Sequence, residues 1–262
     1  MRIIHIINPV KVDSSSDLFV AQPITFESFR IARESCTGVE VLQCTTQFEE
    51  DRAIIPSHFR ITRNLKRSVA DMGGPVLKRK LPLIRDILKK AYRMSKKGDY
   101  IIYTNVDIAL KPEFYNWVLK IIENGMDAFI VNRRTISAHY KHPSELPEMY
   151  SEQGEKHPGY DCFIFQREMF PKMYLGNICI GAAYIGLVLY LNMNLIGDNF
   201  KEFGDESLTF HIGDDQVWKN PENNPYAAFN KKEFEKVKSK FKKRFHNVDE
   251  VIDNAFPTLR SS

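Results

Sequence analysis

The chain has 262 residues, a length that allows one large α/β domain or two small ones. Its apolar fraction of 43% and charged fraction of 27% are those of an ordinary globular protein and exclude a low-complexity chain. Net charge is only +4, and the four cysteines form no C-x-x-C pair. We therefore expect buried, reduced thiols and a cytoplasmic protein.

Two segments bear on membrane insertion. The N-terminal run MRIIHIINPV is too short and lacks the small-residue cleavage site of a signal peptide, so it is predicted as a first strand. The apolar run at residues 178–196 is long enough for a membrane span, but Asn192 and Asn194 interrupt it. A buried core helix is the favoured prediction for this run, and a span is the alternative.

Strands and helices alternate along the chain. The first strand at residues 2–8 precedes a helix at 25–34 with Thr25 as its N-cap, and Gly73-Gly74-Pro75 closes a helix at 59–72. Alternation of this kind predicts an α/β fold with a mostly parallel sheet covered by helices on both faces. The remaining predicted elements are strands at 39–42, 100–103, 128–131, 162–165 and 207–215, helices at 81–95, 111–124 and 178–196, and a loop at 137–159.

Polar residues gather where the predicted strands begin or end. Ligands of parallel sheets bind beyond the carboxyl ends of the strands, so these residues are candidates for a functional site. They are Asn8 after the first strand, Asn105 and Asp107 after the strand at 100–103, Arg133 and Arg134 after the strand at 128–131, Asp161 before Cys162, and His211, Asp214 and Asp215 at the last strand.

One long stretch indicates the kind of site. The chain has neither a P-loop nor a dinucleotide-binding glycine fingerprint. KLPLIRDILKKAYRMSKKGDYIIYTNVDIALKPEFY, at residues 80–115, resembles the glycosyltransferases of the GT-A fold, which carry Asp-x-Asp where this chain has Asn105-Val106-Asp107. FHIGDDQVW, at 210–218, is similar to the late His motif of that family, with His211 and Gly213 closer together. The resemblance covers residues 1–218, and Asn105 is its main departure.

The resemblance implies a single GT-A-like domain over residues 1–218, followed by an extension at 219–262. It implies transfer of a sugar from a nucleotide-diphosphate donor to a hydroxyl of a glycan or glycolipid. Asp107 and His211 would hold Mn²⁺ or Mg²⁺, and Asp161 would be the general base or a donor-sugar contact, with Asp214 and Asp215 as rivals. The implied donor-binding residues are Asn8, Arg79, Lys80, Asn105, Asp107, Arg133 and Arg134.

Two other functions compete with sugar transfer. A non-catalytic nucleotide- or sugar-binding member of the same fold is the alternative, because Asn105 and the altered late motif are changes that loss of activity would produce. A nucleotidyltransferase also carries carboxylates at strand ends, but no glycine-rich signature follows the first strand.

The extension contains a basic amphipathic segment. Residues 231–246 carry eight Lys or Arg against two Glu, a net +6, and Phe234, Val237, Phe241 and Phe245 recur at helical spacing. This helix either docks its Phe stripe on the domain or contacts an anionic membrane surface. Nucleic acid is not expected as a partner, because no recognised binding module is present. We expect the domain to fold without this segment.

Overall fold

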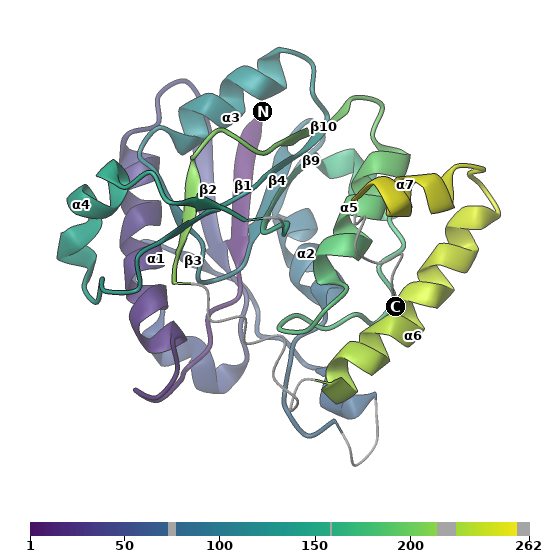
Figure 1. The fold of residues 1–262 in the computed structure, drawn as a ribbon, viewed down its shortest axis with the longest axis horizontal. Coiled ribbons are helices and arrows are strands. Elements are labelled where there is room, and N and C mark those ends of the chain that lie inside the picture. Colours follow the sequence, from purple (N-terminus) through teal and green to yellow (C-terminus); the bar gives the residue numbers. More distant parts are fainter. Residues whose placement is uncertain (73–76, 158, 214–223, 256–262) are drawn as a thin grey trace.

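The computed structural model describes residues 1–72, 77–157, 159–213 and 224–255. Its centre is a seven-stranded sheet in which only β9 runs antiparallel to its neighbours β4 and β6 (Figure 1). The prediction of a mostly parallel sheet is therefore confirmed. The spatial order is β10 (Phe200–Phe203), β6 (Ala128–Val131), β9 (Cys162–Gln166), β4 (Tyr100–Thr104), β1 (Arg2–Ile7), β2 (Glu40–Thr45) and β3 (Arg60–Ile61).

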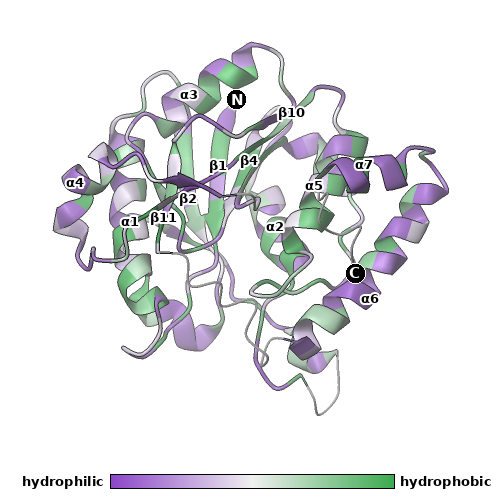
Figure 2. Cartoon of the chain, viewed as in Figure 1, coloured by the Kyte–Doolittle hydropathy of each residue, from purple (hydrophilic) through white to green (hydrophobic). Residues whose placement is uncertain are grey.

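Helices cover both faces of this sheet, and its central strands consist mostly of apolar residues (Figure 2). The buried His5 of β1 is an exception and hydrogen-bonds Tyr115 and Thr104. Side chains alternate along β1: Ile3 and Ile7 pack with α1 (Leu18–Glu34) and α3 (Phe114–Glu123), whereas Ile4 and Ile6 face the opposite way. The second face is covered by α2 (Ile84–Met94), α5 (Ile185–Ile196), α6 (Asn224–Lys242) and α7 (Val248–Ala255).

A small second sheet lies beside the first. Its strand order is β5 (Ala109–Leu110), β11 (Thr209–Ile212), β7 (Arg134–Ile136) and β8 (Glu155–Lys156). β11 pairs antiparallel with β5, which closely follows β4 in the chain. The small sheet therefore carries the end of β11 back to the end of β4.

Three segments differ from the prediction made from the sequence. The helix predicted at 59–72 is wrong: after β3 the chain runs extended along β2 to a 3₁₀ turn at Val69–Asp71. The N–H groups of Thr62 and Leu65 donate to the Thr45 and Gln47 carbonyls, so they are not available for helical bonds.

Burial explains the other two differences. α1 begins at Leu18 rather than Thr25 and continues through Pro23, because Ala21 and Ile24 of its first turns are buried; Thr25 lies inside the helix. The predicted loop at 137–159 contains α4 (Leu146–Ser151) and β8, since Leu146 and Met149 of α4 are buried in the cluster that also holds Phe210 of β11.

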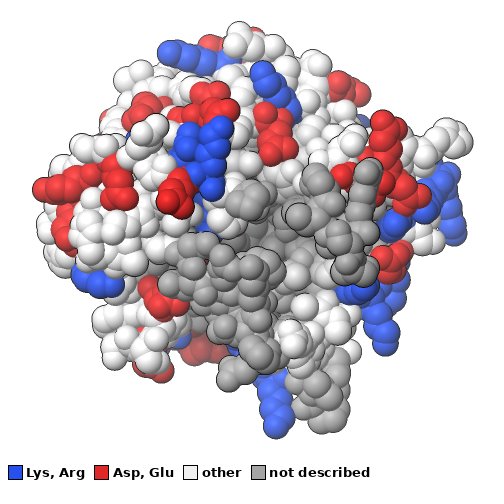
Figure 3. All heavy atoms as spheres, viewed as in Figure 1, with Lys and Arg blue, Asp and Glu red and all other residues white. Residues whose placement is uncertain are grey.

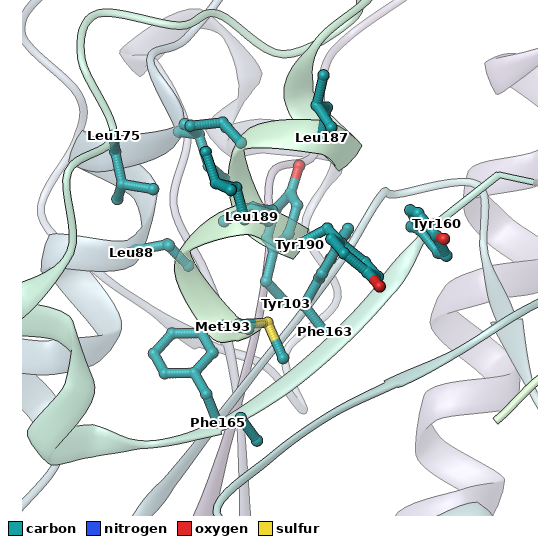
Figure 4. Close-up of a cluster of buried hydrophobic side chains, with 14 of the residues drawn as sticks. Leu88, Tyr103, Tyr160, Phe163, Phe165, Leu175, Leu187, Leu189, Tyr190 and Met193 are labelled. Atoms are coloured by element: carbon teal, nitrogen blue, oxygen red, sulfur yellow. The ribbon is translucent and has the colours of Figure 1, made fainter. Parts of the chain in front are cut away.

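The apolar run at 178–196 forms a core helix, α5, over its second half. Figure 4 shows Leu189, Tyr190 and Met193 lying over Tyr103 and Phe163 of the central sheet. The buried Asn192 amide is satisfied, because its side chain accepts from the Tyr174 N–H (2.7 Å) and donates to the Tyr174 carbonyl (2.9 Å). Of the helices that the structure describes, none has the length and apolarity needed to cross a membrane.

The Phe stripe of α6 packs onto the domain. Phe234, Val237 and Phe241 are at most 3% exposed and belong to the same apolar cluster as α5. This is the docking alternative of the sequence analysis. The expected boundary at residue 218 lies outside the described residues.

Substitution of Phe241 by Ala is expected to lower the free energy of unfolding by about 3–5 kcal/mol, because a fully buried ring is replaced by a cavity. Phe245→Ala is the matched control: Phe245 is only partly buried at the end of the same stripe, and its loss should be smaller. Urea unfolding followed by circular dichroism measures both. An unchanged midpoint for Phe241→Ala would show that α6 is a dispensable extension, as expected from the sequence.

A buried carboxylate ties the start of β1 to the start of β4. Asp99 is 3% exposed and accepts hydrogen bonds from the Arg2 N–H (2.8 Å), the Arg2 guanidinium (2.9 Å) and the Lys96 N–H (2.8 Å). Although burial alone would raise it, these donors and the Arg2 charge lower the pKa of Asp99. The pair therefore stabilises the fold when Asp99 is ionised.

Asp99→Asn is expected to lower the free energy of unfolding by about 1–3 kcal/mol at pH 7. A lowered carboxyl pKa contributes stability that is present above the ordinary value of 3.8 and is lost as pH falls through the folded-state value. The difference between wild type and variant should therefore shrink below about pH 4. Urea unfolding between pH 3 and 7 tests this, and a difference that is constant over that range would contradict it.

Candidate functional site

Strand pairing brings three predicted site residues to one point. Thr104 at the end of β4 and Val131 at the end of β6 both pair with Cys162, the first residue of β9. Because β9 is antiparallel, Asp161 before it meets Asn105 after β4 and Arg133, two residues after β6. These polar groups therefore gather beyond the strand ends, at the edge of the sheet.

The Asp161 carboxylate is held from two sides. Its Oδ1 accepts a hydrogen bond from the Asn105 Nδ2 (3.2 Å), and its Oδ2 lies 3.4 Å from the Arg133 Nε. The Asp161 and Arg133 side chains are only 13% and 10% exposed, so the pair is largely desolvated. Asn105 is held in turn by the Tyr103 hydroxyl, which donates to its Oδ1 (3.0 Å).

Asp107 and His211 form the second part of the cluster. The Nε2 of His211 lies 3.4 Å from Oδ2 of Asp107, and its Nδ1 lies 2.7 Å from the carbonyl oxygen of Gly213. A carbonyl only accepts, so Nδ1 carries a proton. In the neutral ring, Nε2 then carries a lone pair and no proton, and it faces a carboxylate oxygen. Because both atoms are acceptors, a proton or a cation must lie between them. Gly213 permits this geometry because its φ of 69° is in the left-handed region.

The two groups shift each other's titration. Burial would lower the pKa of His211, but the hydrogen bond and charge of Asp107 outweigh it and raise that pKa. Burial likewise would raise the pKa of Asp107, and the neighbouring His211 and Arg133 lower it instead. In the absence of a cation, His211 thus favours its protonated form beside an ionised Asp107, and a metal ion would have to displace that proton.

Unsatisfied buried oxygens mark the cluster. Oδ1 of Asp107, Oδ2 of Asp161 and Oδ1 of Asn132 are buried and accept no hydrogen bond from any described residue. Similar atoms occur elsewhere in the described residues, so what they show here is that the cluster has acceptor oxygens to which a cation or a hydrogen-bond donor could bind.

A divalent cation fits this donor set. One carboxylate and one imidazole nitrogen suit Mn²⁺, and a single carboxylate with substrate phosphates and water suits Mg²⁺. The described residues contain no group of three or more His, Cys, Asp or Glu that could hold a metal by itself. The remaining ligands would therefore come from a bound substrate and water.

Comparison with known proteins identifies the fold. No family model and no curated protein matches the chain, whereas solved structures do. Residues 1–349 of S. aureus TarS in complex with UDP-GlcNAc align with a TM-score of 0.51 and 9% identity over 84% of this chain. The chain spans 61% of the length of that structure. The chain has a GT-A-like fold.

Other matches are more distant. The same part of TarS in complex with UDP gives a TM-score of 0.48 at 10% identity, over 83% of this chain and 62% of that one. A putative glucose-1-phosphate thymidylyltransferase from Bacillus anthracis in complex with a sucrose gives 0.47 at 10% identity, over 86% and 95%. At these identities the likeness concerns the fold alone.

Several predicted donor residues contact residues outside this cluster. Asn8 donates to the Thr46 carbonyl (2.6 Å), beyond the ends of β1 and β2. The Arg79 guanidinium lies over the Tyr226 ring, and Lys80 pairs with the exposed Glu50 (2.6 Å).

Arg134 also lies apart from the cluster, since its guanidinium bonds Ser207 (2.9 Å) and lies 3.9 Å from Asp205. Of the two adjacent arginines, only Arg133 therefore contacts Asp161. Asp214 and Asp215 are outside the described residues.

Two residues of the cluster were not predicted. Tyr103 ends in a hydroxyl 3.0 Å from Asn105 Oδ1, but its position in an apolar strand gave no signal beyond burial. His157 lies with its Nδ1 3.8 Å from Asp161 Oδ2. Its place four residues before Asp161, in a turn with Gly159, was the available signal.

Proposed function

We propose that the chain is a glycosyltransferase that moves a sugar from a nucleotide-diphosphate donor to a hydroxyl acceptor. The observation that carries this proposal is the pair of buried, unsatisfied carboxylate oxygens, Asp107 Oδ1 and Asp161 Oδ2, gathered with Arg133 at the strand ends of a GT-A-like sheet. The site then offers one carboxylate for a cation and another for the sugar or the acceptor.

In this proposal Asp107 and His211 hold Mn²⁺ or Mg²⁺ against the donor diphosphate. When bound, the ion neutralises the negative charge that develops on the leaving diphosphate. Asp107 would supply a carboxylate oxygen, and His211 would supply Nε2 once that atom has lost its proton. Arg133 lies against Asp161, and its charge also acts on Asp107, so it adds to the positive potential of the site.

Asp161 is proposed as the residue that faces the transferred sugar. Its hydrogen bonds and the Arg133 contact fix its orientation, and its Oδ2 has no hydrogen bond from a described residue. A carboxylate in that state can take a proton from an acceptor hydroxyl or hydrogen-bond the donor sugar.

The alternative function is a non-catalytic nucleotide- or sugar-binding protein of the same fold. An assay of nucleotide-sugar turnover distinguishes a glycosyltransferase from a non-catalytic binding protein. A panel of nucleotide-sugars that includes UDP-GlcNAc, the ligand in the TarS structure, should be hydrolysed slowly by the purified chain in the presence of Mn²⁺. Binding of one member by calorimetry without release of its nucleotide would favour the alternative.

Asp107→Ala is expected to abolish metal-dependent binding of a nucleoside diphosphate, because the charged ligand of the ion is lost. His211→Ala should weaken that binding by about tenfold or more while leaving the fold intact. Asp205→Ala is the control, since Asp205 is an exposed carboxylate that pairs with Lys156 and Arg134. Calorimetric titration with and without Mn²⁺ measures each. Wild-type binding that is indifferent to metal, with normal binding by Asp107→Ala, would refute the metal site.

Asp161→Asn is expected to lower kcat by about 100-fold or more if Asp161 is the general base, with little change in nucleotide affinity. The isosteric amide keeps the shape but cannot take the proton. Steady-state transfer to the identified acceptor, paired with nucleotide titration of the same variant, separates the two effects. Near-normal transfer would move the role to Asp214 or Asp215.

A glycan or glycolipid is proposed as the acceptor, and α6 as a surface that brings the enzyme to a membrane. Figure 3 shows Lys and Arg gathered over α6 at the right of the molecule. Lys238 and Lys242 both pair with the single carboxylate of Asp249 of α7. The exposed cations of α6 and the following turn that form no ion pair with a described residue are Lys231, Lys232, Lys240, Lys243 and Arg244.

Because the apolar side of α6 is buried, its contact with lipid would be electrostatic, about 1 kcal/mol for each cation near an anionic surface. Replacing Lys232, Lys240 and Lys243 together by Gln should abolish co-sedimentation with phosphatidylglycerol vesicles at low salt. Replacing the exposed Lys96, Lys97 and Lys120 by Gln changes the charge equally and should not. Equal sedimentation of the two triple variants would contradict a membrane surface on α6.

A further inference from the structure

The amide of Asn105 is fixed at both ends. Its Oδ1 accepts from the Tyr103 hydroxyl (3.0 Å), and its Nδ2 donates to Asp161 Oδ1 (3.2 Å). Tyr103 is 1% exposed, and burial with the charges of Asp107 and Asp161 raises its pKa, so the hydroxyl stays protonated. Rotating the amide by half a turn would set its carbonyl oxygen against the Asp161 carboxylate, two acceptors with no proton between them.

A carboxylate could not replace this amide. An Asp at position 105 would place its oxygens about as close to Asp161 as the Asn105 nitrogen is now, and two carboxylates at that distance cannot both be ionised. The proton they shared would reduce the negative charge on Asp161. The departure of this chain from Asp-x-Asp therefore has a local physical reason, the contact between residue 105 and Asp161.

Asp161 depends on side-chain contacts for its position. It precedes β9 rather than lying in it, so the sheet does not fix its backbone. Asn105 holds Oδ1, and Arg133 lies against Oδ2. Of these two contacts, only the Asn105 amide can orient the carboxylate without neutralising its charge.

We propose that Asn105 is a positioning residue for Asp161: its amide, held by Tyr103, fixes the orientation of the Asp161 carboxylate in the site. In this proposal Asn105 acts through Asp161 and not through direct contact with the donor or a metal ion. The role of Asp161 once positioned rests on the proposed function, but the pairing itself does not.

The pairing is tested by a double-mutant cycle in urea unfolding at pH 7. Asn105→Asp should lower the folding equilibrium constant by about tenfold or more, because it sets two carboxylates together. Combining it with Asp161→Asn exchanges the two side chains, so that the carboxylate stands at position 105 and the amide at position 161, and the hydrogen bond between them is restored. The folding equilibrium constant of the double variant should then be at least about fivefold larger than the value expected if the effects of the two single substitutions were independent.

Asn124→Asp combined with Asp161→Asn is the matched control and should be additive, since Asn124 is an exposed residue at the end of α3. An additive result for the 105/161 cycle would overturn the proposal. If Asn105→Asp does not fold, the cycle is run with Asn105→Ala and Asp161→Ala, and additivity there overturns it equally.

Kinetics separates positioning from donor binding. Asn105→Ala and Tyr103→Phe should each lower kcat about tenfold or more in the transfer assay while the donor KM changes less than about twofold. A raised KM with unchanged kcat would make Asn105 a donor contact and overturn the positioning role. If the wild-type chain transfers no sugar, the proposed function fails, and the unfolding cycle alone decides this inference.

Discussion

The reversed direction of β9 is the constraint on which the site depends. A parallel strand brings its C-terminal neighbours in the chain to the carboxyl edge of the sheet, whereas an antiparallel strand brings its N-terminal neighbours there. Inserting β9 between β4 and β6 therefore places Asp161 against Asn105 and Arg133, residues far from it in the chain. The small sheet likewise brings His211 to the site, because β11 pairs antiparallel with β5 and its end lies next to Asp107.

Charge balance then determines which ligands this edge of the sheet can bind. Two carboxylates, one guanidinium and the imidazoles of His157 and His211 are crowded into a poorly solvated place. Although burial opposes both shifts, Asp107 raises the pKa of His211, and His211 and Arg133 lower the pKa of Asp107. With His211 protonated the cluster is close to neutral. A divalent cation entering beside Asp107 would expel that proton, so the cation and the proton compete for one space.

Sequence reasoning found the central sheet and most of the clustered residues because those signals are local. The helix now seen as α2 has a strong apolar period, and Asn105, Asp107, Arg133 and His211 each stand at or close to a strand end. The errors came from long-range contacts. Thr62 and Leu65 bond to β2 instead of forming a helix, and no local pattern records that choice. The bond between Asn105 and Asp161, 56 residues apart, likewise requires knowing how β9 pairs.

The two edge strands of the central sheet affect how readily the protein aggregates. A strand at the border of a sheet exposes unpaired N–H and C=O groups that can recruit a strand from another molecule. β3, at one border, has only two residues, too few to template a partner. β10, at the other, presents the exposed, oppositely charged side chains of Lys201 and Glu202 in its middle. The short edge strand β3 and the charged edge strand β10 thus disfavour the pairing of further chains with the central sheet.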